Sequence, residues 1–383
     1  MRVALVSHYY PAHRGGVERV AGELAARLAR GGAVQIEWHA SDCDPAPPAA
    51  PALASVPAAS CNALERGTGL PYPLWSPSAL RRLARAVRTA DVVHVHDFVY
   101  LPCLAAFLAA RRARRPVLVT QHVGFVPFRN PLLRALLGAA NRVIGAWVLG
   151  RATRVVFESA SVQGYFSRFA RFRAAPALVP NGVDTAKFVP ASDSRREEIR
   201  QGLGVDPGTP LLLFVGRFVE KKGLPVLREL TARIPHARWL LAGWGPIDPA
   251  AWHRSNVTVV RQPSIDELIP LYQAADLLVL PSVGEGIPLV IQESMACGTP
   301  ALVGEETAAG CPEAGELLLR EPAGDSGAAE RWAARIRALT ETPEPLRALR
   351  QGVAQRARSA WSWERCTERY LELLRACADH ACA

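Results

Sequence analysis

The residues best suited to chemistry lie in the stretch GEGIPLVIQE, Gly284 to Glu293. An apolar run, LLVLPS, precedes it, and Pro288 can begin a helix that follows the loop. Glu285 would then lie in the loop and Glu293 inside the helix, about 8–12 Å apart along its axis. Gly286, Ile287, Pro288 and Leu289 would mark the helix start, where free backbone N–H groups bind phosphate well. The spacing predicts an extended ligand, for example one with a sugar hydroxyl at one end and a ribose at the other. The alternative for Glu293 is that a glutamate near a helix start is favoured by the helix dipole without any ligand.

Two cations follow an earlier apolar run in the segment LLLFVGRFVEKKG. Arg217 comes directly after the run, and Lys222 lies five residues further on, before Gly223. An arginine can bind a phosphate bidentately, and a lysine adds a compact charge. The pattern predicts a pyrophosphate site, and a solvated basic loop is the alternative.

A pair of glycines, Gly15 and Gly16, stands between the first apolar run and a helical pattern over 17–30. Glycine lets the backbone approach a ligand closely, and the amides of a helix start attract anions. A tight turn without a ligand would have the same sequence.

Short apolar runs alternate with amphipathic helical stretches along the whole chain. Runs that are apolar at consecutive positions indicate strands buried on both faces, as in a parallel sheet covered by helices. The pattern occurs twice and predicts two facing, doubly wound α/β domains with a ligand cleft at the carboxyl ends of the strands. We place the domains at 1–185 and 186–360, with a C-terminal helix over 361–383 that packs back toward the first domain. The Pro-rich segment 45–60 is expected to be a mobile loop, and residues 180–210 an interdomain linker.

Composition narrows the class of protein. Of the 383 residues, 49% are hydrophobic and 21% charged, as in soluble globular proteins, and no uninterrupted apolar run is long enough to span a membrane. The eight cysteines are scattered without a C-x-x-C pair, which favours reduced thiols in the cytoplasm. Residues 1–180 hold 22 Arg and 9 acidic residues, so the whole positive surplus lies in the first half and predicts an anionic partner.

Eight segments carry a family resemblance, in this order along the chain: GGVERV, DVVHVH, TQH, NGVD, FVGRFVEKKG, LLAGWGP, EGIPLVIQE and WSWERCTERYLELL. With these segments the chain resembles glycosyltransferase family 4 enzymes of the GT-B fold over nearly its whole length. The resemblance implies that Glu285 contacts the donor sugar and Glu293 the nucleotide ribose. It also implies that Arg217 and Lys222 stabilise the diphosphate and that Gly16 approaches it from the first domain. Further residues implied to act at the donor site are His122 near the reacting centre, and Gly243 and Gly245 beside the nucleotide.

The same resemblance implies sugar transfer with retention from a nucleotide-diphosphate sugar, UDP- or GDP-linked, to a saccharide or lipid-linked acceptor in glycolipid, cell-envelope or polysaccharide synthesis. Cations and helix-end amides can stabilise the leaving diphosphate, so neither a metal nor another cofactor is expected. The chain departs from the family pattern at Ala309–Glu313, AGCPE, and at Arg261–Pro263, RQP. Both departures bear on the base preference more than on the activity.

The segment 129–154, RNPLLRALLGAANRVIGAWVLGRATR, combines bulky apolar residues with five arginines. Such a helix can lie on an anionic bilayer, while a core-facing helix is the alternative. The basic first half favours a cytoplasmic enzyme that associates peripherally with the inner face of the membrane.

Other functions remain open at this point. A sugar-nucleotide epimerase would share the donor site, whereas a phosphorylase would need a cofactor lysine among Lys187, Lys221 and Lys222. The basic isoelectric point alone suggests a nucleic-acid binder, but the chain has no recognisable nucleic-acid module, and no such partner is expected.

Overall fold

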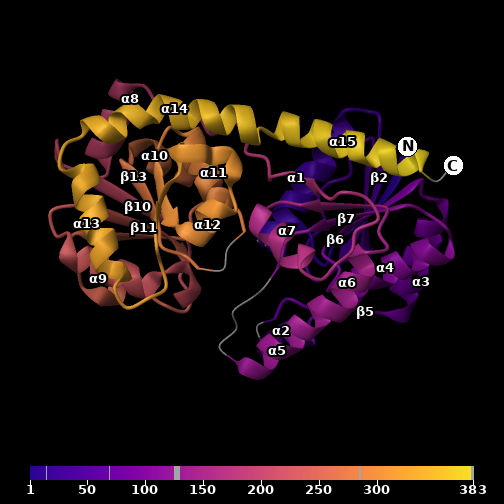
Figure 1. Ribbon diagram of the computed structural model, residues 1–383. Coiled ribbons are helices and arrows are strands. Elements are labelled where there is room, and N and C mark those ends of the chain that lie inside the picture. The colour runs from indigo at the N-terminus through magenta and orange to yellow at the C-terminus, as the bar shows by residue number, and fades with distance from the viewer. Residues whose placement is uncertain (14, 69, 125–129, 284–285, 381–383) are drawn as a thin grey trace. The chain divides into compact units, whose positions relative to one another are not determined.

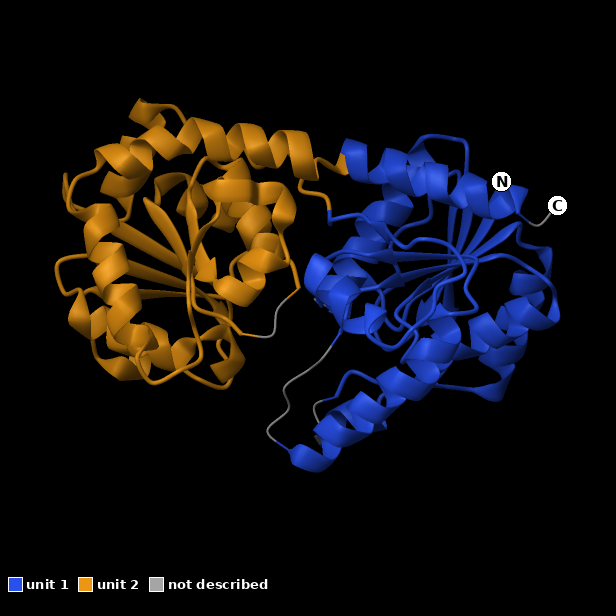
Figure 2. Ribbon diagram, viewed as in Figure 1, with its two compact units in different colours: residues 1–181, 364–383 blue, residues 182–363 orange. Residues whose placement is uncertain are grey.

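The computed structural model describes residues 1–13, 15–68, 70–124, 130–283 and 286–380. The chain forms two compact units (Figures 1 and 2). Unit 1 comprises residues 1–181 and 364–383, and unit 2 comprises residues 182–363.

Unit 1 is built on a seven-stranded parallel sheet in the order β3-β2-β1-β6-β7-β8-β9. From β1 the strand order continues toward one edge of the sheet through β2 and β3, and from β6 it continues toward the other edge. The point where the order reverses therefore lies between β1 and β6, and ligands bind at this switch point in such sheets. The strands are β1 (Arg2–Val6), β2 (Gln35–Ser41), β3 (Leu53–Ala58), β6 (Val92–His96), β7 (Val117–Gln121), β8 (Arg154–Phe157) and β9 (Ala177–Leu178), and β4 (Ser60–Cys61) and β5 (Leu74–Trp75) pair separately. The helices are α1 (Gly16–Arg30), α2 (Ala63–Thr68), α3 (Pro77–Thr89), α4 (Leu101–Arg112), α5 (Pro131–Ala140), α6 (Ala146–Leu149) and α7 (Ala160–Ser167), joined by α15 (Trp363–Asp379).

Unit 2 has a six-stranded parallel sheet in the order β12-β11-β10-β13-β14-β15. Its switch point lies between β10 and β13, whose apolar side chains are fully buried, as the consecutive apolar runs predict. The strands are β10 (Leu211–Arg217), β11 (Arg238–Trp244), β12 (Val257–Arg261), β13 (Leu277–Leu280), β14 (Ala301–Gly304) and β15 (Leu319–Glu321). The helices are α8 (Asp193–Gly202), α9 (Leu224–Arg233), α10 (Ile265–Ala274), α11 (Leu289–Ala296), α12 (Glu305–Ala309), α13 (Ala328–Thr340) and α14 (Glu344–Trp361).

Two segments differ from the sequence expectation. The predicted loop 45–60 contains β3, whose Pro57 is tolerated because β3 is an edge strand with β2 as its neighbour in the sheet. The predicted linker 180–210 contains α8, which packs into unit 2 because Arg200 and Arg196 both pair with Asp276. Both segments are therefore structural parts of a domain.

The apolar and basic segment 129–154 forms a helix from Pro131 to Leu149, with α5 and α6 joined by a π-helical turn at Asn141–Gly145. By length and composition this helix could cross a membrane, with a mean hydropathy of 1.4 and 28% of the window buried. Arg134 and Arg142 interrupt the apolar run, as the sequence shows, but the average over the helix stays apolar.

Candidate active site

In unit 2, the carboxyl ends of β10 and β11 hold the first predicted cation. Arg217 ends β10, and its guanidinium carbon lies 4.7 Å from the ring centre of Trp244, which ends β11. The indole of Trp244 is 42% exposed. This stacking restrains the arginine while leaving its charge available to a ligand.

The glycines near Arg217 allow close backbone packing. Gly243 and Gly245 both have positive φ, and a Cβ atom on either would meet the backbone of the β10 end, at Gly216 or Phe218. Gly223, also at positive φ, lies against the carbonyl of Pro281. The structure thus explains why these positions are glycine, and their contact with a nucleotide stays a prediction.

Lys222 lies at the end of a short 3-10 turn, Glu220–Lys222, directly before Gly223. The neighbouring Lys221 carbonyl accepts a hydrogen bond of 3.0 Å from the amide of Val283. The lysine turn after β10 and residues 281–283 after β13 are therefore joined at the same edge of the sheet.

The loop between β13 and α11, residues 281–288, is described only in part. Glu285 lies outside the described residues. Gly286 and Ile287 precede Pro288, the N-cap of α11, and Leu289 begins the helix. Glu293 is 3% exposed, and its Oε2 atom accepts a hydrogen bond of 2.8 Å from the hydroxyl of Tyr272.

The two departures from the family pattern occupy different surroundings. Arg261 forms an exposed ion pair with Asp248 at 2.8 Å, and Gln262 adopts a left-handed backbone conformation after β12. Cys311 is buried, and burial raises the pKa of Glu313.

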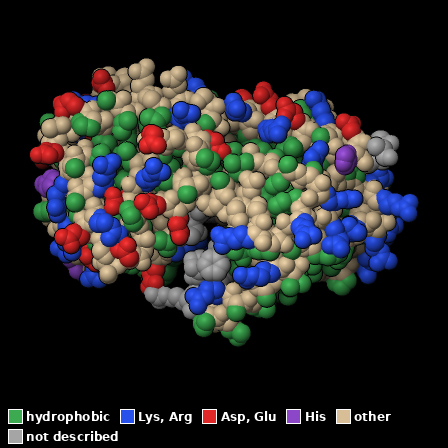
Figure 3. All heavy atoms as spheres, viewed as in Figure 1, with side chains coloured by type: hydrophobic (Ala, Val, Ile, Leu, Met, Phe, Trp, Pro, Cys, Tyr) green, Lys and Arg blue, Asp and Glu red, His purple; other side chains and the backbone are tan. Residues whose placement is uncertain are grey.

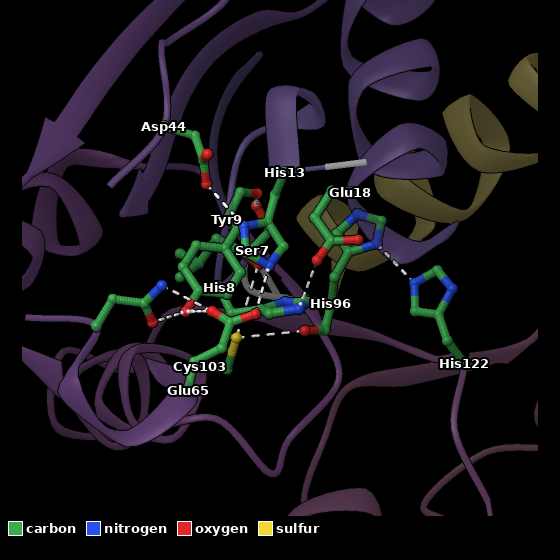
Figure 4. A network of polar contacts seen from close by, with 12 residues as sticks. Ser7, His8, Tyr9, His13, Glu18, Asp44, Glu65, His96, Cys103 and His122 are labelled. Carbon is green, nitrogen blue, oxygen red and sulfur yellow. Dashed lines mark hydrogen bonds and ion pairs between the residues drawn. The ribbon is translucent and has the colours of Figure 1, made fainter. Parts of the chain in front are cut away.

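In unit 1, the ends of β6, β7 and β8 surround His122. Its Nδ1 atom lies 2.7 Å from Glu158 Oε1. Its Nε2 atom lies 2.8 Å from His96 Nδ1 (Figure 4). Asp97 accepts hydrogen bonds from the backbone amides of His122 and Val123. Both nitrogen atoms of the imidazole, and the backbone that carries it, are thereby held in place.

The charge of His122 follows from these partners. Burial lowers its pKa, but attraction and hydrogen bonding to Glu158, with a contribution from Asp97, outweigh burial and raise the pKa to about 9. Burial holds the pKa of His96 well below its usual value. A charged His122 therefore donates from Nε2 to Nδ1 of a neutral His96.

This histidine cluster is anchored to the last helix. His94 Nε2 lies 2.8 Å from the hydroxyl of Thr120, and that hydroxyl lies 3.2 Å from the hydroxyl of Tyr370 on α15. The three side chains are buried. The C-terminal helix thus contributes directly to the core beneath the histidines.

The end of β1 carries two further polar groups. His8 Nε2 lies 2.8 Å from Glu18 Oε1, and the two side chains are 2% and 4% exposed. Gly15 is the N-cap of α1 and packs against the Glu18 carboxylate, while a Cβ atom on Gly16 would meet open space. The first turn of α1 is therefore accessible at Gly16.

An Asp-x-Asp sequence, Asp42-Cys43-Asp44, follows β2, contrary to the expectation that the chain has none. Asp42 accepts hydrogen bonds from Ser60, and Asp44 lies 2.8 Å from His13 Nδ1. His13 Nε2 lies 3.0 Å from Glu65. Among the described residues, no group of three or more histidine, cysteine or acidic residues is arranged to hold a metal ion.

Similarity to known proteins identifies the family. Residues 14–187 match the model Glycosyltransferase Family 4, and residues 209–342 match Glycosyl transferases group 1. D-inositol 3-phosphate glycosyltransferase 1 of Catenulispora acidiphila is 30% identical over 85% of this chain and 80% of its own length. The chain belongs to glycosyltransferase family 4.

Two further proteins extend the comparison. Alpha-maltose-1-phosphate synthase of Mycobacterium tuberculosis is 29% identical to this glycosyltransferase over 98% of the chain and 99% of its own length. Anabaena HepE, crystallised in complex with UDP-glucose, superimposes with a TM-score of 0.73 at 18% identity, covering 98% of this chain and all of that one. The structural likeness shows that this enzyme has the GT-B fold.

Within this glycosyltransferase, Arg217 and Lys222 follow β10 at the carboxyl edge of the unit 2 sheet, whereas Glu293 is buried in α11 against Tyr272. Gly16 and His122 come after β1 and β7 at the carboxyl edge of the unit 1 sheet. Sequence reasoning missed the partners His8, Glu18 and Glu158. Glu158 could have been found, because it follows β8, the neighbour of β7 that precedes His122. No sequence signal pairs His8 with Glu18.

Proposed function

We propose that this family 4 glycosyltransferase transfers a sugar with retention from a UDP- or GDP-linked donor to a saccharide or lipid-linked acceptor that carries negative charge. Arg217 and Lys222, at the carboxyl edge of the unit 2 sheet, carry the proposal. Two cations can neutralise the charge that develops on the diphosphate as its bond to the sugar breaks. Glu293 would contact the ribose, Glu285 the sugar, and Gly16 the diphosphate.

Further observations support a negatively charged acceptor and a positive charge at the reacting centre. The surplus of arginines over acidic residues in the first half favours an anionic acceptor. The relatives' names include D-inositol 3-phosphate and maltose 1-phosphate, which both carry a phosphate. His122, held as an imidazolium by Glu158, would add positive charge near the reacting centre.

The reaction is proposed to need no metal or other cofactor, because the arginine and the lysine supply the positive charge. Family membership favours sugar transfer over the epimerase alternative. The product would serve glycolipid, cell-envelope or polysaccharide synthesis in the cytoplasm. Full turnover in the presence of EDTA is the expected result, and a restored rate on adding a divalent cation would contradict it.

The donor can be identified first by thermal stability, since a ligand that binds the native state raises the melting temperature. We expect one UDP- or GDP-sugar to give the largest increase. Lys222→Ala and Glu285→Ala should each lower kcat at least about 100-fold with that donor. Lys221→Ala is the matched control, and near-normal turnover in either test variant would contradict the assignment.

A peripheral membrane location is proposed from the surface of the helix 131–149. Leu132, Leu136 and Val143 are 76%, 65% and 69% exposed, and their spacing places them on one face. Arg134 and Arg142 are exposed on the same helix. In Figure 3, hydrophobic side chains lie at the free end of α5 with basic side chains beside them. This combination suits the surface of an anionic bilayer.

Flotation with vesicles tests this location. The enzyme should float with phosphatidylglycerol-containing vesicles but not with phosphatidylcholine alone, and added salt should weaken binding. Replacing Leu132, Leu136 and Val143 by serine should abolish flotation, whereas Leu108→Ser, on the exposed side of α4, should not. Binding that survives the triple replacement, or concentration-dependent dimers without lipid binding, would contradict the proposal.

A further inference from the structure

The first turn of α1 already holds a negative charge. The N-cap Gly15 offers no side-chain cap, and the carboxylate of Glu18 folds back against it. The carboxylate also accepts a hydrogen bond from the backbone of Glu18 itself. An acidic group thus occupies part of the helix end at which anions bind.

The Glu18 carboxylate is ionised and held in place. Burial raises its pKa, but the hydrogen bond and attraction to His8 outweigh burial, so the pKa lies below its usual value. The ring of His8 stacks on Tyr100 with centroids 3.7 Å apart and planes 4° from parallel. The ring of Tyr9 also lies beside His8, with centroids 5.3 Å apart and planes tilted by 55°. The carboxylate therefore cannot swing away freely when a ligand arrives.

A fixed negative charge acts differently on the substrate and the product of the proposed reaction. The diphosphate of a nucleotide sugar carries two negative charges. When the bond between the anomeric carbon and the phosphate oxygen breaks, the electron pair stays on that oxygen, and the sugar forms its new bond to the acceptor oxygen. The acceptor proton leaves to phosphate or solvent, and at neutral pH the free nucleoside diphosphate carries close to one additional negative charge.

We propose that Glu18 is a charge-discriminating residue that weakens the binding of the nucleoside diphosphate product relative to the nucleotide-sugar donor. This proposal rests on the proposed function, in which Gly16, two residues from Glu18, approaches the diphosphate. Repulsion grows with the charge of the ligand, so it acts more strongly on the product. His8 orients the carboxylate and keeps its pKa below the usual value.

The test compares the inhibition constant of the nucleoside diphosphate with the KM of the donor. In Glu18→Gln the product should bind at least about threefold more tightly relative to the donor than in the wild type. A purely structural role would weaken both ligands together. An unchanged ratio, or a relative weakening of the product, overturns the proposal.

Two further variants complete the design. Glu23→Gln, on the same helix at an exposed carboxylate, is the matched control and should leave the ratio unchanged. His8→Asn removes the partner that keeps the pKa of Glu18 low, so burial should raise that pKa and the product should bind more tightly relative to the donor, as in Glu18→Gln. This variant decides the matter if Glu18→Gln fails to fold. A wild-type enzyme that binds no nucleotide sugar would refute the proposed function, whereas normal donor binding with an unchanged ratio would refute the role of Glu18 alone.

Discussion

Replacing Glu158 by glutamine removes the negative charge that faces His122 across 2.7 Å while nearly preserving the shape of the side chain. The two side chains are 9% and 5% exposed, so solvent screens their attraction little. The pair raises the pKa of His122 to about 9 although burial alone would lower it. One pKa unit corresponds to about 1.4 kcal/mol, so the difference from the usual value of about 6.5 amounts to about 3 kcal/mol.

The sign of the pH dependence follows from the raised pKa. Because folded His122 holds its proton more tightly than the unfolded chain, this stabilisation is complete below about pH 6.5 and is lost as the pH rises through about 9. In Glu158→Gln the pKa of His122 should fall below 6.5, since burial then dominates. The free energy of unfolding unit 1 should therefore drop by up to about 3 kcal/mol near pH 6.5, and its decline toward pH 9 should disappear.

Histidine-labelled protein would give the direct measurement by NMR titration of His122, with urea unfolding at several pH values beside it. Glu37→Gln is the matched control, because Glu37 faces His39 at 3.0 Å but is 45% exposed. An exposed pair should contribute below about 1 kcal/mol. A wild-type His122 that titrates near 6.5, or a Glu158→Gln variant that still titrates near 9, would refute the reasoning.

Three further changes test unit 2. Asp276→Asn should lower the free energy of unfolding by about 3 kcal/mol in urea, because two arginines of α8 lose their carboxylate partner. Tyr272→Phe should raise the KM of the donor about threefold or more with little change in kcat, since Glu293 loses the hydroxyl that orients it. Trp244→Ala should lower kcat about tenfold in steady-state assays, whereas Trp244→Phe should keep most of the rate because a ring can still stack on Arg217.

Each of these three has a contrary result. Unfolding of Asp276→Asn at the wild-type urea concentration would mean that the ion pairs add nothing to stability. A loss of kcat without a change in KM would remove Tyr272 from donor binding. Equal rates in the alanine and phenylalanine variants of Trp244 would show that stacking does not position the arginine.

The sequence predicted the two parallel sheets well because their central strands are apolar at every position. Val92 and Leu277, for example, lie in runs whose burial on both faces leaves a clear signal. The edge strand β3 was missed because it has no such run and contains Pro57. Helix α8 was not predicted because its charged sequence resembles a linker. Arg196 and Arg200 are nevertheless buried, because both form ion pairs with Asp276.

The candidate site was predictable only where a motif marks it. Glycines and cations at strand ends could be recognised from local sequence, as with Gly223 beside Lys222. The pairing of His122 with Glu158 depends on which strands are neighbours, and that of His8 with Glu18 on how one turn folds back. Such contacts arise from tertiary packing, which local patterns do not specify.

The course of the chain has a consequence for its synthesis. The chain leaves unit 1 after Asn181 and returns to it only with α15 (Figure 2). Tyr370, Leu374 and Cys377 of this helix are buried. A ribosome must therefore finish all of unit 2 before unit 1 can close its core around Thr120. Until then the nascent first domain exposes an apolar surface, and a chain that stops anywhere within unit 2 leaves both domains defective.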